Sequence, residues 1–135
     1  MVIKNFDRFM TCLAGGGILT MINFIFGEID YSLTMLLIAM ITDFATGLLC
    51  GANEHSISSR IAINGLFRKL MILVYVMLAH HLDVLLDVNY IRTAVCYMYI
   101  VSEIISIIEN GAKLGVPIPE PIKKALELMN NHKED

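Results

Sequence analysis

The sequence predicts an all-α membrane protein with four transmembrane helices, both termini on the inner side, and a short amphipathic helix near the C-terminus. Hydrophobic residues make up 56% of the chain and charged residues only 17%, with a mean hydropathy of +0.66. Soluble domains are closer to a quarter charged. The other two observations are a division into four apolar runs and the gathering of basic residues on alternate sides of those runs.

The four apolar runs are long enough to cross a bilayer as helices. Each contains about 17–20 residues, and a helix of about 20 residues is about 30 Å long, the thickness of the hydrocarbon core. A soluble bundle could bury the third and fourth runs, but four such runs in 135 residues leave too little polar surface for that. The expected spans are residues 9–27, 31–50, 70–86 and 91–108.

The first run follows Lys4 and Arg8 and so resembles a secretory signal peptide. The run is long, however, and the residues 27–30 that follow it are not a small-x-small cleavage site. We therefore interpret it as a membrane span.

The basic residues predict the orientation of the spans. With both termini inside, nine of the ten Lys and Arg residues are cytoplasmic, and only Arg92 lies outside. The inner connection, residues 51–69, either lies along the membrane surface as an amphipathic segment or is an ordinary loop. The residues expected to set topology and to contact the inner surface are Lys4, Arg8, Arg60, Arg68 and Lys69.

Two carboxylates are expected near the middle of the bilayer. Asp43 and Glu103 each lie twelve residues into a span from its outer end, so they should share one depth. An Asp at that depth costs about 2.5–3.5 kcal/mol on insertion scales. Two such groups do not both ionise comfortably, so either one holds a proton or His80 pairs with one of them.

Further polar and small residues form faces on spans two, three and four. The polar groups on these faces either form hydrogen bonds with each other inside one bundle, or line a water-filled space in an oligomer. Small residues spaced by four also let helices approach closely in lipid. The candidate residues for helix packing, oligomerisation or pore lining are Asp43, Gly47, Gly51, His80, Asp83, Ser102, Glu103, Ser106 and Glu109.

No catalytic, cofactor or metal site is expected. The three cysteines fit neither a disulfide framework nor a metal-ligand spacing. His80 and His81 point about 100° apart on a helix, and the glycines at 15–17 lack the lysine of a phosphate-binding loop. A net charge of −3 gives no indication of nucleic acid as a partner. We therefore expect a protein that is not an enzyme.

The tail is predicted to hold a short helix after a stiff joint. Gly111 and Gly115 end the fourth span, and three prolines between 117 and 121 form an extended spacer. Ile122, Leu126 and Met129 fall on one side of the following helix, which is too short to be stable alone. Its apolar side docks on lipid, on the inner connection or on another subunit, or the segment is instead a frayed, solvated tail. We therefore divide the chain into a membrane domain, 1–110, and a cytoplasmic joint and tail, 111–135.

Several motifs, in order, resemble the toxin-secretion/phage-lysis holin family, also called phage holin family 4. The strongest is EIISIIENGAKLGVPIPEPI at residues 103–122, and the others are DFATG at 43–47, SSR at 58–60 and GLFRK at 65–69. Asp83 and Arg92 also fit the family pattern, and the resemblance covers about residues 34–128. Glu54-His55 departs from it, because more basic character is expected there.

The resemblance implies a homo-oligomeric protein of the bacterial cytoplasmic membrane. Such proteins accumulate in the lipid bilayer and open lesions through which a cell-wall hydrolase passes. Relatives encoded beside clostridial toxin genes are implicated in toxin release, so the expected cargo is a hydrolase or a toxin. Other functions considered are a non-lytic export channel for large toxins, a small ion channel or proton-linked transporter built on Asp43 and Glu103, and an accessory subunit without a pore.

Overall fold

The computed structural model describes residues 15–53 and 59–131, and all the regular structure in these ranges is α-helical. A helix at Gly15–Phe26 comes first. It is followed by α2 (Tyr31–Asn53), α3 (Ser59–Leu86), α4 (Ile91–Lys113) and α5 (Glu120–Asn131). The all-α fold class expected from the sequence is confirmed.

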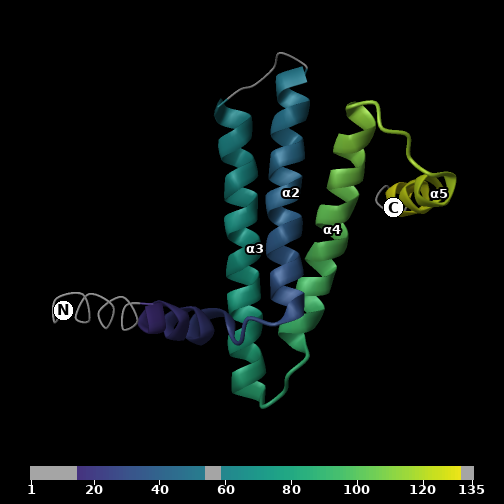
Figure 1. Ribbon diagram of the computed structural model, residues 1–135. Helices are drawn as coiled ribbons and strands as arrows, with labels where there is room; N and C mark the ends of the chain where they lie inside the picture. Colours follow the sequence, from purple (N-terminus) through teal and green to yellow (C-terminus); the bar gives the residue numbers. More distant parts are fainter. Residues whose placement is uncertain (1–14, 54–58, 132–135) are drawn as a thin grey trace, which may run out of the picture.

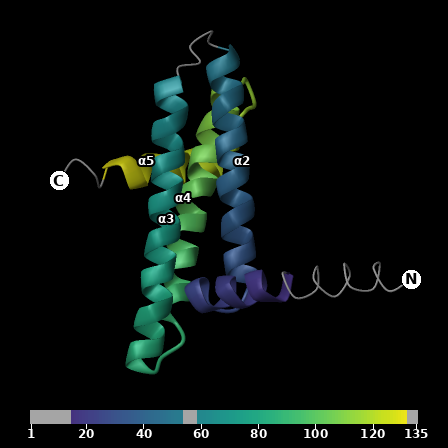
Figure 2. The ribbon, with the colours of Figure 1, turned by 90° about the vertical axis from the view of Figure 1, so that its left-hand side faces the viewer.

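Three helices, α2, α3 and α4, are long and apolar enough to cross a membrane. They stand side by side in both ribbon views (Figures 1 and 2). The central partner is α4, which packs along both α2 and α3, whereas α2 and α3 touch each other little. The second, third and fourth apolar runs are therefore each part of a helix of membrane-spanning length.

The expected connection at 51–69 is mostly helix. From Ser59 onward its residues form the first turns of α3, and residues 51–53 extend α2. The segment 59–69 is thus neither a separate surface helix nor a loop. It contains no proline, and its one glycine, Gly65, is tolerated within a helix, so nothing stops α3 from beginning early. Residues 54–58 lie outside the described part of the chain.

The described part of the first apolar run does not lie alongside the other helices. The Gly15–Phe26 helix runs across the bundle axis, at the end where α2 begins (Figures 1 and 2). Gly27 produces this turn with a φ of +79°, a conformation that side chains disfavour. A Cβ there would also lie 2.8 Å from Nδ1 of His80. Residues 9–14 of the expected span lie outside the described residues.

The tail contains a helix where the sequence predicts one, but Gly111 lies within α4 and does not end it. Gly115, with a φ of +88°, lies just beyond the end of α4, and α5 begins at Glu120, so Pro121 stands in its first turn. α5 runs across the bundle axis (Figures 1 and 2) and packs little against α2, α3 or α4. Ile122 is partly exposed, and the side chains of Leu126 and Met129 are outside the described set.

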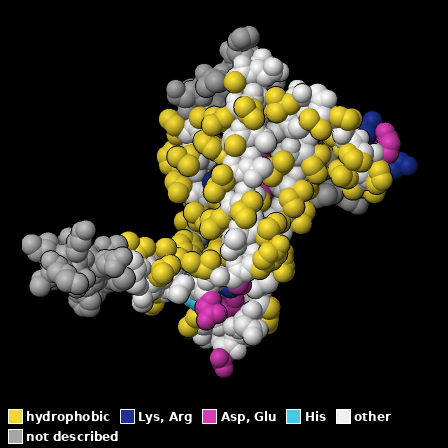
Figure 3. Space-filling view, viewed as in Figure 1, with side chains coloured by type: hydrophobic (Ala, Val, Ile, Leu, Met, Phe, Trp, Pro, Cys, Tyr) yellow, Lys and Arg dark blue, Asp and Glu magenta, His cyan; other side chains and the backbone are white. Residues whose placement is uncertain are grey.

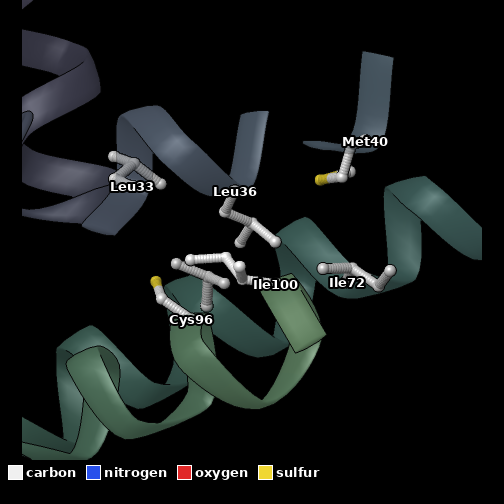
Figure 4. Packing of buried hydrophobic residues seen from close by; sticks show 7 residues of the cluster. Leu33, Leu36, Met40, Ile72, Cys96 and Ile100 are labelled. Carbon is white, nitrogen blue, oxygen red and sulfur yellow. The ribbon is translucent and has the colours of Figure 1, made fainter. Parts of the chain in front are cut away.

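A small apolar cluster joins the three long helices. Leu36, Val76 and Cys96 are its most buried members, one from each helix. Figure 4 shows Leu36 and Cys96 among the side chains that pack between the helices. Many apolar side chains are exposed over the face of the bundle shown in Figure 3, and side chains such as Leu85 are exposed by 78%. An exposed apolar surface of this kind is suited to lipid.

A polar cluster around Arg92 ties the helix ends together below the apolar cluster. The carboxylate of Asp83 accepts hydrogen bonds from the backbone N–H groups of Ile91 and Arg92, each at 2.9 Å. These are among the first N–H groups of α4, which have no partner within the helix. Asp83 on α3 therefore caps α4.

The Arg92 side chain extends this cluster to the segment between the first described helix and α2. Its guanidinium donates to the carbonyls of Phe26 and Glu28, at 2.9 and 2.8 Å, and to the carboxylate of Asp30 at 2.5 Å. Asp30 in turn accepts the N–H of Leu33 at 2.9 Å and so caps α2. Burial raises the pKa of Asp30, but the hydrogen bonds from Leu33 and Ser32 and the charge of Arg92 outweigh it and lower the pKa below its usual value.

Replacing Asp83 should loosen this end of the bundle. Asp83→Leu leaves two N–H groups of α4 without an acceptor, and an unsatisfied buried group costs about 1–3 kcal/mol. We expect the variant to unfold earlier when detergent-solubilised protein is titrated with SDS and followed by circular dichroism. Glu28→Ala is the control, because the Glu28 side chain is exposed and makes no hydrogen bond to any other described residue. Equal stability of the two variants would contradict the capping role.

Candidate functional site

Lys69 lies between the two carboxylates that the sequence places at one depth. Its ammonium is 2.9 Å from Asp43 and 2.5 Å from Glu103, so one side chain from each of α2, α3 and α4 meets at this point. We call these three residues the Lys69 triad. The three side chains are exposed by only 17%, 12% and 9% for Asp43, Lys69 and Glu103. Two carboxylates, Glu103 buried and Asp43 partly buried, share one ammonium.

Asn110 extends the triad along α4. Its amide nitrogen donates to the Asp43 carboxylate at 3.2 Å and to the Thr46 hydroxyl at 3.1 Å. The Cys50 thiol lies 3.2 Å from the Asn110 carbonyl. Among the described residues no buried side-chain nitrogen or oxygen lacks a hydrogen-bond partner. The polar interior is therefore satisfied within one subunit, because α2, α3 and α4 supply each other's partners.

The triad borders an open cavity of about 800 Å³ between α2, α3 and α4. The cavity lies in the half of the bundle nearer the α2–α3 connection. Small residues on α2 and α3, including Gly47 and Gly65, leave it wide, and nothing lies within 4 Å of a Cβ built on Gly65. At its other end stand Tyr75 and Tyr99, whose rings stack with centroids 6.0 Å apart. The apolar cluster closes the bundle beyond them.

The structure brings together most, but not all, of the candidate residues. Asp43, Gly47, Gly51, Ser102, Glu103 and Ser106 line the cavity. His80 and Asp83 lie instead at the Arg92 end, where the His80 ring stands against Gly27, so His80 is not the partner of either mid-bundle carboxylate. Glu109 is exposed and does not line the cavity.

The residues expected to contact the inner surface have different surroundings. Lys69 is partly buried in the triad, and Arg68 borders the cavity with an exposed side chain. Arg60 belongs to the first turn of α3, but its side chain is not described, and Lys4 and Arg8 lie outside the described residues. Within the described ranges, no group of three His, Cys, Asp or Glu side chains is placed to hold a metal ion.

Sequence reasoning missed Lys69 as the partner of the two carboxylates because it assigned this residue to the inner connection at 51–69. The numbers of residues between charged side chains on α3 and on α4 could have indicated this pairing. Lys69 is 14 residues from Asp83 on α3, and Glu103 is 11 residues from Arg92 on α4. Since Asp83 caps α4 beside Arg92, these separations place both side chains at about the same height, roughly 17–21 Å away. Asn110, Asp30 and Arg92 were missed as partners for a similar reason, because their roles depend on which helices are neighbours.

Removing either carboxylate of the triad should weaken the bundle without preventing membrane insertion. Asp43→Leu and Glu103→Leu each take one interhelical partner from Lys69, and such hydrogen bonds are worth about 0.6–2 kcal/mol each in membranes. We expect altered oligomer distribution and shifted timing of any lysis, with normal amounts of inserted protein. Glu109→Leu is the matched control, since it removes an exposed carboxylate from α4. Wild-type assembly in both triad variants would show that the carboxylates are incidental.

Comparisons with known proteins identify the family. A model of the bacteriophage holin family matches residues 20–131, which includes the triad, the Arg92 cluster and α5. The chain is 34% identical to a probable holin of Bacillus phage phi105 over 109 residues, covering 80% of each chain.

Two bacterial relatives are similar over most of their length. An uncharacterized 14.9 kDa protein in the nagH 3′ region of Clostridium perfringens is 43% identical, over 84% of this chain and 88% of its own. The protein YqxH of Bacillus subtilis is 37% identical, over 82% and 79%. No solved structure matches the chain. The family match covers well over half of the sequence, and the chain belongs to the bacteriophage holin family.

Proposed function

We propose that this protein is a holin that oligomerises in the bacterial cytoplasmic membrane and forms lesions, through which a cell-wall hydrolase reaches the wall and lyses the host. Family membership supports a membrane protein of this kind. The structural observation that carries the proposal is the Lys69 triad at the edge of an open cavity between three helices, which expose many apolar side chains on their outer surfaces.

The bundle offers a physical route from a sealed state to a lesion. In one subunit the apolar cluster lies between the Lys69 triad and the Arg92 cluster on all three helices. The described part of the subunit therefore has no polar path from end to end. Because α2 and α3 touch little, neighbouring copies can separate them and turn their polar faces toward shared water. Folded enzymes are tens of ångströms wide, so a passage for them must be walled by many copies.

The proposed topology places both termini and the α2–α3 connection in the cytoplasm. α2, α3 and α4 supply three of the four spans. The first apolar run supplies the remaining span when the chain turns at Gly27 so that this run lies along the bundle. The membrane domain is then 1–110, and the joint and tail at 111–135 lie on the cytoplasmic face. Lys4 and Arg8 support this arrangement, because basic residues flanking a span are retained inside.

Single cysteines test the topology in a background without Cys12, Cys50 and Cys96. Cysteines replacing Ile29 and Asn89 should react with an impermeant thiol reagent in intact cells. Cysteines replacing Val2, Ser59 and Asn131 should react only after permeabilisation. Labelling of Val2→Cys from outside would mean that the first run does not span, whereas labelling of Ser59→Cys from outside would overturn the whole arrangement.

The size selectivity of the lesion tests the proposed activity. Purified protein above a threshold density should make liposomes leak small dyes and folded proteins alike, and below that density the liposomes should stay sealed. Conduction of protons or one ion species, with dyes retained at every density, would contradict the holin proposal and indicate a channel or transporter.

A parallel measurement in cells separates lysis from export. The protein is expressed with and without a wall hydrolase, and release of a cytoplasmic marker is scored. Lysis only in the presence of the hydrolase supports the proposed role. Release of a large co-expressed toxin from cells that stay intact would indicate the alternative, a non-lytic export channel.

A further inference from the structure

We infer that the cavity beside the Lys69 triad binds one anionic phospholipid, with its phosphate group near Arg68 and Lys113 and an acyl chain along the gap between α2 and α3. The inference concerns a ligand of the single subunit. It does not depend on whether the assembled protein lyses cells or exports a cargo.

The charges around the cavity favour an anionic head group. Lys69 is neutralised by its two carboxylates, but Arg68 and Lys113 also line the cavity. Neither is found within 4.0 Å of a carboxylate among the described residues, and both side chains are exposed. Arg68 is on α3 and Lys113 is on α4, two helices that pack against each other, and both residues border the same cavity.

The walls of the cavity favour an acyl chain. Leu48 on α2 and Phe67 and Met71 on α3 border it and are exposed by 39%, 62% and 47%. They stand on the two helices that touch each other little, so the cavity opens between apolar side chains toward the surrounding lipid. A volume of about 800 Å³ is within the range of about 300–1,000 Å³ typical of ligand pockets.

The satisfied polar interior also favours a lipid over a ligand that binds the triad itself. The buried polar atoms of Asp43, Lys69, Glu103 and Asn110 already have partners within the subunit. What the cavity offers an incoming molecule is therefore an apolar wall and two cations that have no carboxylate partner within the described ranges. Basic pockets between membrane helices are known to hold the head groups of anionic lipids.

Lipid titration of the purified full-length protein tests the inference. Native mass spectrometry would count the bound molecules of dihexanoylphosphatidylglycerol, with dihexanoylphosphatidylcholine as the zwitterionic comparison. We expect one anionic lipid per chain and clearly weaker binding of the zwitterionic lipid. Arg68→Gln with Lys113→Gln should weaken binding about 30-fold, since each basic residue near an anionic lipid contributes about fivefold.

A second variant tests the apolar half of the site without changing charge. Gly65→Leu places a side chain in open space within the cavity, so the fold should be retained while lipid binding is blocked. Gly16→Leu is the matched control, because Gly16 is equally unobstructed but lies in the first helix, outside the cavity. Lys123→Gln with Lys124→Gln controls for charge, since these lysines belong to α5. Both controls should bind like wild type.

Four results would overturn the inference. Equal affinity for the two lipids would show that the charge of the head group does not contribute to binding. Competition by glycerol phosphate as strong as that by the lipid would indicate a site for free phosphate. Wild-type binding by Gly65→Leu would place the lipid elsewhere on the protein. An altered oligomeric state of Gly65→Leu with unchanged lipid binding would indicate that a second copy of the chain occupies the cavity.

Discussion

One ammonium shared by two carboxylates, each from a different helix, is the interaction on which the rest of this structure depends. Charges placed within an apolar bundle are costly unless they are paired. Lys69 pairs with Asp43 and Glu103 together, so α3 is held against α2 and α4 at the same point. The triad compensates for the little direct contact between α2 and α3. It also keeps the cavity polar on one side while the outer surfaces stay apolar.

The Arg92 cluster likewise joins helices through charged and polar contacts at the opposite end of the bundle. The two clusters together fix the register of the helices. Between them, each long helix contributes to the apolar cluster: Leu36 from α2, Val76 from α3 and Cys96 from α4. A slip of one turn would move a charged group into this layer and an apolar side chain into a polar cluster. Electrostatic pairing therefore supplies the specificity that apolar contacts between helices cannot supply in lipid.

The helices of the bundle could be predicted from the sequence because each is a long apolar run, and its length is set by the thickness of a bilayer. The carboxylates Asp43 and Glu103 could be placed at one depth by counting residues. Their partner could not, because Lys69 follows Arg68 in a stretch that resembles a basic inner loop. Only the extension of α3 back to Ser59 places Lys69 inside the bundle. The crosswise first helix was likewise missed, because it depends on the φ of Gly27 and on contacts with His80 and Arg92.

The central claim is that Lys69 holds the bundle together because two buried carboxylates require it, and a comparison of two variants tests this most directly. Lys69→Met alone leaves two buried carboxylates without a cation, and breaking a buried pair from one side costs about 3–5 kcal/mol. Combining it with Asp43→Asn and Glu103→Gln removes every charge of the triad. Measured by SDS titration of the detergent-solubilised protein, the single variant should unfold much earlier than wild type, and the triple variant should recover most of the loss. Wild-type stability of Lys69→Met, or a triple variant no more stable than the single one, would contradict the account.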